Sequence, residues 1–399
     1  MLDFLTLNTS TTLRSHRFIA VLCILALGLA GWLPVVNFLS LFVRDELGGD
    51  IAGAGLLLAA MHGSRSTVGI FVGVALGRFG SQRTYTFGLT GLAAFVAIMA
   101  VTPDLRLFVI AAPFGGLALT MHWAAAQTYV MEVAPSDRRG LASSIMSFIV
   151  VAAPGIGGVI LGILANTYGF RLFAIIAAAL LALAALSAMK FLPATETTLP
   201  SRSTSLPRLT KDLLQMIRHP SVQVLALIRA CTTVIYGAFI ILAGPKLVAA
   251  GGDLADVGWL IFIAAVAGAT AQVFVGAMSD RIGRRGALTA TLALGTVTTA
   301  IYGQVDSFFV LLGLWAGYAF TQSVFQSMIV AIAADIAPPQ RLGQIMAIDS
   351  TAYSFGVTVA AILAMVTGDT EPTIIFWAGA AAGLVAVCAV GRLPASHRR

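Results

Sequence analysis

Long apolar stretches, each long enough to cross a lipid bilayer, recur along the whole chain. A spanning helix needs about 20 predominantly apolar residues. These stretches are unbroken, whereas the strands of a membrane barrel alternate in polarity, so they indicate helices. The helices are expected at residues 18–43, 52–76, 84–102, 107–131, 141–165, 171–191, 221–248, 255–278, 286–303, 307–333, 344–367 and 372–391. The sequence therefore predicts an all-α membrane protein with twelve transmembrane helices.

One long polar connection divides these helices into two sets of six. Residues 192–220 are rich in Pro, Ser and Thr and carry basic residues, which is typical of a linker. A short amphipathic helix is expected near residues 209–217, on the membrane surface. We expect an N-terminal bundle over residues 1–191 and a C-terminal bundle over residues 221–399.

The two sets of helices repeat each other at an offset of 203 residues. Gly48-Gly49-Asp50 matches Gly251-Gly252-Asp253, and Gly80 matches Gly283. Because the offset spans six helices, both halves have the same orientation in the membrane. The repeat predicts two parallel halves with a binding site between them near the bilayer midplane.

Composition and charge support a membrane protein and predict its orientation. Only 10% of the residues are charged, against roughly 25% in soluble domains. If the N-terminus is cytoplasmic, 18 of the 24 Lys and Arg residues fall in inside segments and 4 in outside loops. This bias predicts a protein of the cytoplasmic (inner) membrane with both termini inside. The net charge of +7 then reflects topology rather than a nucleic-acid partner.

The chemistry of an enzyme or a primary pump is missing from the sequence. The three cysteines lie in separate apolar stretches and have no disulfide or zinc-ligand spacing. No paired histidines, clustered carboxylates or phosphate-binding loop occur. We therefore expect no metal, no cofactor and no enzymatic activity.

The segment GAMSDRIGRRGAL, at residues 276–288, resembles the signature of the major facilitator superfamily between the second and third helices of a half. The resemblance implies a monomeric transporter that works by alternating access. It also implies that Asp280 docks on the N-terminus of a helix of the other half. The first-half copy has Gly77 in place of that aspartate. The expected gating residues are Gly73, Arg78, Gly80, Glu132, Arg138, Gly276, Asp280, Arg281, Gly283, Arg284, Asp335 and Arg341.

Within this gating group, two ion pairs are expected inside the halves. Glu132 and Asp335 end equivalent helices, and we expect them to pair with Arg78 and Arg281 of their own halves.

The fifth predicted helix contains Ala153-Pro154-Gly155-Ile156-Gly157-Gly158, which is similar to a motif of superfamily antiporters. Pro154, Gly157 and Gly158 would give a kinked, thin helix face, and the resemblance favours efflux. The alternative is an ordinary flexible packing helix. An arginine that many exporters carry in the fourth helix is absent, which removes support for the usual scheme of proton coupling.

Ionisable residues inside a membrane helix are costly, so each is a candidate for function. Arg65 either faces the central cavity, where it binds an anionic or carbonyl-rich group of the substrate, or is structural. Asp349 is a protonation site, the salt-bridge partner of Arg229, or both, with the pair broken and remade during the cycle. His122 is either a proton carrier or a core histidine.

The candidate residues fall into two sets. The proton-coupling set is Asp349, His122 and Arg229. The substrate-binding set is Arg65, His62, His122, Asn37, Gln127, Tyr236, Tyr318, Gln322, Gln326 and Tyr353. The function expected first is proton-coupled efflux of small organic molecules by a secondary transporter. The alternative is transport of organic anions, in either direction, with Arg65 as the substrate anchor.

Overall fold

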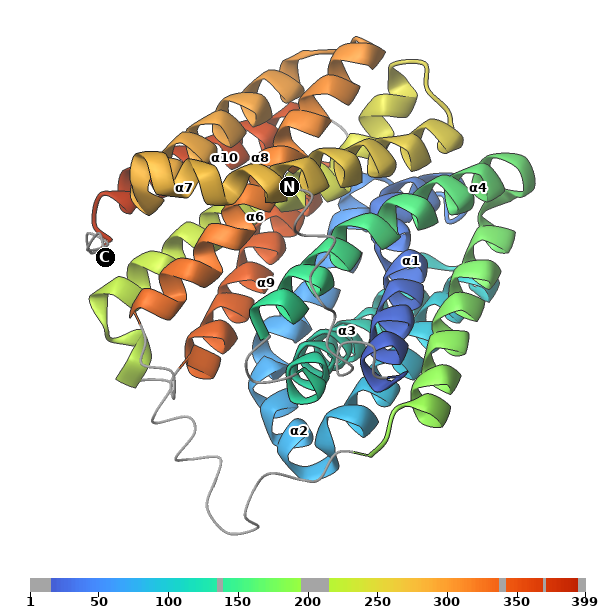
Figure 1. Cartoon of the computed structure of the whole chain (residues 1–399). Helices are drawn as coiled ribbons and strands as arrows, with labels where there is room; N and C mark the ends of the chain where they lie inside the picture. Colours follow the sequence, from blue (N-terminus) through green and yellow to red (C-terminus); the bar gives the residue numbers. More distant parts are fainter. Residues whose placement is uncertain (1–15, 135–138, 195–214, 337–341, 369–370, 394–399) are drawn as a thin grey trace, which may run out of the picture.

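The computed structural model describes residues 16–134, 139–194, 215–336, 342–368 and 371–393, and in these ranges every regular element is helical. Two helical bundles lie side by side, one coloured blue to green and the other yellow to red (Figure 1). The helices are α1 (His16–Asp45), α2 (Ile51–Val101), α3 (Leu105–Val133), α4 (Arg139–Phe191), α6 (Pro220–Ala249), α7 (Leu254–Gln304), α8 (Phe308–Ile336), α9 (Leu342–Thr367) and α10 (Thr373–Val390).

Three of these helices are each divided by one glycine. Gly80 in α2, Gly169 in α4 and Gly283 in α7 have φ values of 79°, 82° and 76° with extended ψ. This conformation is open to glycine and reverses the chain without a loop. The nine helices of the described residues therefore form twelve helical segments, as the apolar pattern predicts. In the described part of the chain, nine helices are long and apolar enough to cross a membrane.

The repeat predicted from the sequence is visible in the backbone. Gly48 and Gly251, at the same offset of 203 residues, both have positive φ. Asp50 and Asp253 then cap α2 and α7, and each accepts a hydrogen bond from a backbone amide of the first turn. Gly80 and Gly283 are likewise at this offset. The two halves are thus built from the same turns.

We call the side of the bundle that carries Phe191 and Pro220 the linker side. Most of the linker lies outside the described residues, and of the amphipathic helix expected over residues 209–217 only 215–217 are described, as helix.

On the side opposite the linker, the halves meet through small residues. A methyl group at Gly55 of α2 would lie 2.6 Å from the carbonyl oxygen of Ala361 in α9. Gly158 and Gly162 of α4 pack directly on Gly258 of α7. Without side chains between them, the helices approach closely, as is common in membranes. These contacts hold α2 against α9 and α4 against α7.

A polar contact joins the same two helices at their ends. Asn166 of α4 donates a hydrogen bond of 3.0 Å from Nδ2 to the carboxylate of Asp253 at the start of α7. The N-cap residue of α7 is therefore held by both halves.

Candidate functional site

A cluster of polar and aromatic side chains joins the two halves deep in the bundle. It consists of residues from four helices, and we call it the central cluster: His62, Arg65, Arg229, Tyr236, Gln326, Asp349 and Tyr353. Five of its members are candidates for substrate binding from the sequence, and the other two, Arg229 and Asp349, are candidates for proton coupling.

Tyr353 of α9 is the residue that connects the halves. The guanidinium carbon of Arg65, from the first half, lies 5.1 Å from the centre of the Tyr353 ring. The guanidinium carbon of Arg229, from the second half, lies at the same distance from it. Both are cation–π distances, and the two guanidinium carbons are at most twice that distance apart. One aromatic ring therefore contacts two cations from different halves.

Two further rings complete the surroundings of Tyr353. The imidazole of His62 lies 6.2 Å from it, and the ring of Tyr236 lies 5.7 Å from it. His62 stands one helical turn before Arg65, so α2 places both side chains on one face.

The two arginines differ in their partners. Arg229 is buried, and its guanidinium forms a salt bridge of 3.2 Å with Asp349. Arg229 also donates a hydrogen bond to the side-chain oxygen of Gln326. In the described part of the chain, no carboxylate pairs with Arg65, and its Nε is buried without a hydrogen-bond partner. The cluster thus carries an excess positive charge, which is located at Arg65.

In this structure Asp349 is the salt-bridge partner of Arg229, which is compatible with either interpretation of Asp349. Only one carboxylate oxygen is engaged. The other, Oδ1, is buried and has no hydrogen-bond partner among the described residues. Asp349 therefore keeps a free position for a proton or for a donor group of a ligand.

The remaining binding candidates lie outside this cluster. His122 is fully buried inside the first half, where its ring stacks on Tyr85 at 5.3 Å. Tyr318 stacks on Phe239 at 4.0 Å inside the second half. Asn37 donates to the carbonyl of Leu33 in its own helix. Gln127 is exposed and Gln322 is partly buried. The surroundings of His122 are those of a core residue, which favours that interpretation.

The first expected gating pair is not formed. Glu132 accepts a hydrogen bond from the hydroxyl group of Ser81. Arg78 is exposed, and its guanidinium lies over the Phe79 ring. The reason is the break at Gly80, because Arg78 precedes it on an exposed face whereas Ser81 follows it and faces α3. Arg138, Arg341, the packing around Gly276 and the side chains of Asp280, Arg281 and Asp335 lie outside the described part of the structure.

The glycines of the fifth-helix motif contact different partners. Gly157 packs on the backbone carbonyl of Ala30 in α1, within its own half. Gly155 and Gly158 face Ala265 and Ile261 of α7, in the other half. The motif therefore forms a contact within the first half and part of the contact between the halves.

Sequence reasoning missed small residues that position the cluster. A methyl group at Gly356 of α9 would overlap the carbonyl of Ala230 and the hydroxyl of Thr233 in α6. This close approach sets α9, which carries Asp349 and Tyr353, against α6, which carries Arg229. Glycines are frequent in membrane helices, so nothing in one sequence distinguishes Gly356 from the others.

Comparisons with known proteins agree on the architecture. The sequence model of the family described as Major Facilitator Superfamily matches residues 20–250 and 225–399. No curated protein matches this chain significantly in sequence. The crystal structure of the nucleoside transporter NupG is similar, with a TM-score of 0.77, 11% identity, and coverage of 94% of this chain and 98% of that chain. A mutant of that transporter gives a TM-score of 0.76 at 12% identity, covering 94% and 99%. At such identities the likeness concerns the fold alone.

Proposed function

Because this chain belongs to the major facilitator superfamily and is a membrane transporter for a small molecule, we propose that its substrate is a small organic anion bound by Arg65 between the halves. The observation that carries this proposal is the arginine without a carboxylate partner. Arg229 is neutralised by Asp349, whereas among the described residues no carboxylate pairs with Arg65, whose guanidinium lies over the face of Tyr353. An unpaired cation in a bilayer is costly unless a ligand compensates it.

Tyr353 provides the means by which such a ligand would move the halves. The contact between Arg65 and Tyr353 crosses from α2 to α9. An anion on Arg65 competes with the ring for the guanidinium, so binding weakens one contact that holds the halves together. Alternating access follows when the halves rock about the occupied site. The excess of Lys and Arg in the linker-side segments supports a cytoplasmic linker side in the inner membrane.

The proposal is tested by transport in proteoliposomes, with panels of organic anions, lipophilic cations and nucleosides, each with and without an imposed pH gradient. Nucleosides are included because NupG is a nucleoside transporter. We expect anion transport by the wild type. Arg65→Gln should reduce it about tenfold or more, because a hydrogen bond to a charged group is worth about 1.5–3 kcal/mol.

The matched control is Arg106→Gln, which removes an exposed arginine at the start of α3. This variant should transport anions at the wild-type rate. Anion transport that is equal in Arg65→Gln and Arg106→Gln would refute Arg65 as the anchor.

Proton-coupled efflux of neutral or cationic compounds is the second candidate, and two observations favour it. Asp349 has a buried, unpartnered carboxylate oxygen that a proton could occupy. Gly155 and Gly158 of the antiporter-like motif pack against α7 of the other half. Gradient-driven movement of cations that is insensitive to Arg65→Gln would establish this candidate in place of the first.

A further inference from the structure

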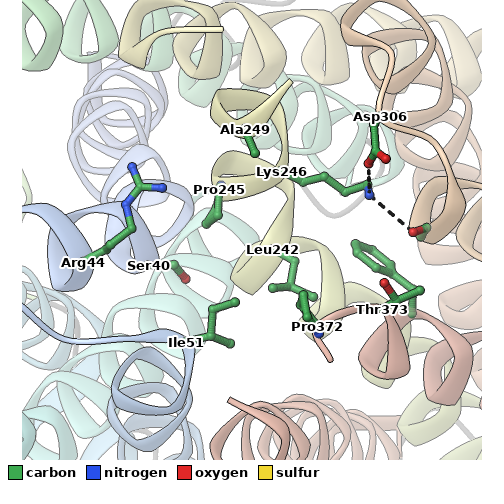
Figure 2. A pocket seen from close by; sticks show the side chains of 12 residues that line it. Ser40, Arg44, Ile51, Leu242, Pro245, Lys246, Ala249, Asp306, Pro372 and Thr373 are labelled. Carbon is green, nitrogen blue, oxygen red and sulfur yellow. Dashed lines mark hydrogen bonds and ion pairs between the residues drawn. The ribbon is translucent and has the colours of Figure 1, made fainter. Parts of the chain in front are cut away.

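A pocket distinct from the central cluster opens between the halves on the side opposite the linker (Figure 2). Its volume is about 310 Å³, at the lower end of the range for small-molecule sites. Ile51, in its wall, precedes Arg65 by fourteen residues of the same helix, or about 21 Å. We call this pocket the peripheral pocket.

Helices α1 and α6 approach each other closely beside the peripheral pocket. A methyl group at Gly244 of α6 would lie 3.1 Å from the Leu41 side chain and 3.5 Å from the Asn37 carbonyl oxygen, both in α1. None of the residues of the central cluster lines this pocket.

The walls of the pocket are mainly apolar, with one unsatisfied hydroxyl group. Leu242, Pro245 and Phe376 supply apolar surface. Ser40 of α1 is 3% exposed and lines the pocket (Figure 2), and its Oγ has no hydrogen-bond partner among the described residues. A helical serine can donate to the carbonyl four residues earlier, and a buried hydroxyl without a partner costs about 1–3 kcal/mol. The free hydroxyl therefore indicates a ligand with a polar group.

Lys246 supplies a positive charge whose present partner is weakly held. Its ammonium donates to the Asp306 carboxylate at 2.9 Å and to the Gly303 carbonyl at 3.3 Å. The Lys246 side chain is 18% exposed, whereas that of Asp306 is 88% exposed. An ion pair with one partner in water contributes about 0–1 kcal/mol. A ligand carboxylate inside the pocket can therefore replace Asp306.

We propose that the peripheral pocket is a second binding site, for a small organic carboxylate with a further polar group. The carboxylate binds Lys246, the apolar body packs on Leu242, Pro245 and Phe376, and the polar group hydrogen-bonds to Ser40. The inference rests on the proposed function in one respect, since the peripheral pocket binds the same class of molecule, a small organic anion. The pocket then holds the substrate before or after it occupies the central cluster.

The test measures protection of a cysteine in the pocket wall. Cys23, Cys231 and Cys388 are replaced with alanine, and Thr373→Cys places the only thiol in the pocket. The full-length protein in lipid nanodiscs is labelled with a methanethiosulfonate reagent in the presence of 4-hydroxybenzoate. We expect the probe to slow labelling severalfold. The uncharged 4-hydroxybenzamide should not protect, and benzoate, which lacks the second polar group, should protect less.

Three variants assign the protection to the pocket. Lys246→Gln should abolish it, and Ser40→Ala should remove the advantage of 4-hydroxybenzoate over benzoate. Asp306→Asn removes the competing carboxylate, so the probe should protect at lower concentration. This opposite effect would not arise from damage to the fold.

The inference is overturned if 4-hydroxybenzoate gives no protection at millimolar concentration or if Lys246→Gln leaves protection unchanged. It is also overturned if Arg65→Gln abolishes protection, because the cysteine would then report closure caused by binding at the central cluster. Protection that persists in Arg65→Gln supports the pocket whatever the transport assay shows about Arg65. Failure at the pocket and failure at the central cluster are thus separate results.

Discussion

Asp349→Asn is expected to destabilise the protein by about 3–5 kcal/mol, because it leaves the Arg229 guanidinium charged and without its counter-ion in the bundle interior. Both residues are less than a tenth exposed. Gln326 and the Tyr353 ring remain as neutral contacts of Arg229, and neither carries a negative charge. The effect is measured as a fall in the midpoint of thermal unfolding in detergent, together with the yield of monodisperse protein.

The same salt bridge predicts partial rescue by a second substitution. Arg229→Gln combined with Asp349→Asn removes both charges, so the double variant should be more stable than Asp349→Asn alone. Asp306→Asn is the control, because it breaks an ion pair whose acid is exposed and should cost about 1 kcal/mol or less. If Asp349→Asn costs no more than Asp306→Asn, the buried pair does not contribute as we infer.

Gly157→Ala is expected to cost about 3 kcal/mol, through overlap of its methyl group with the carbonyl oxygen of Ala30. The obstacle is backbone, so it cannot rotate away, and α4 must move from α1 to admit the methyl group. The change is read from the thermal midpoint of the purified protein. Gly313→Ala is the matched control in α8, since no atom lies within 4 Å of the added methyl group.

The two glycine substitutions are expected to differ in sign as well as size. Gly313→Ala should leave the midpoint unchanged or raise it slightly, because alanine is the better helix former. Equal thermal midpoints for the two variants would show that α4 can move away from α1 without loss of stability.

Much of the fold follows from the sequence because lipid imposes one requirement on every segment. An apolar stretch of sufficient length must be a helix, so each of the twelve expected segments is found in the structure. Their separation at Gly80, Gly169 and Gly283 was less predictable, since a continuous helix and a glycine-broken one have similar composition. The repeat at 203 residues indicated two of these positions but not Gly169, which has no glycine counterpart.

The sequence identified most residues of the central cluster but not how they contact one another. Intramembrane charge identified Arg65, Arg229 and Asp349 because a bilayer makes such residues rare. Depth along the helices suggested the pair of Arg229 and Asp349. Nothing in the sequence showed that Tyr353 contacts both arginines, because that contact depends on how α2, α6 and α9 are rotated about their axes.

Polarity alone also placed His122 among the candidates, although its ring packs against Tyr85 in the first half. The spacing of residues along a helix predicts how deep a residue lies and on which face of the helix it lies. It does not predict whether that face packs against the other half or against helices of the same half. The peripheral pocket was missed for the same reason, since Ser40 and Lys246 are unremarkable in their own helices.

With Arg65 as the proposed substrate anchor, the ring of Tyr353 competes with the substrate for the Arg65 guanidinium. In the empty protein the guanidinium already has a favourable partner, so a substrate gains only the difference between its own contact and the one it displaces. A weaker internal partner, as in Tyr353→Leu, would tighten apparent substrate affinity and loosen the empty halves at once. If Arg65 anchors the substrate as proposed, affinity and the resting position of the halves both depend on this one side chain, and a change in one alters the other.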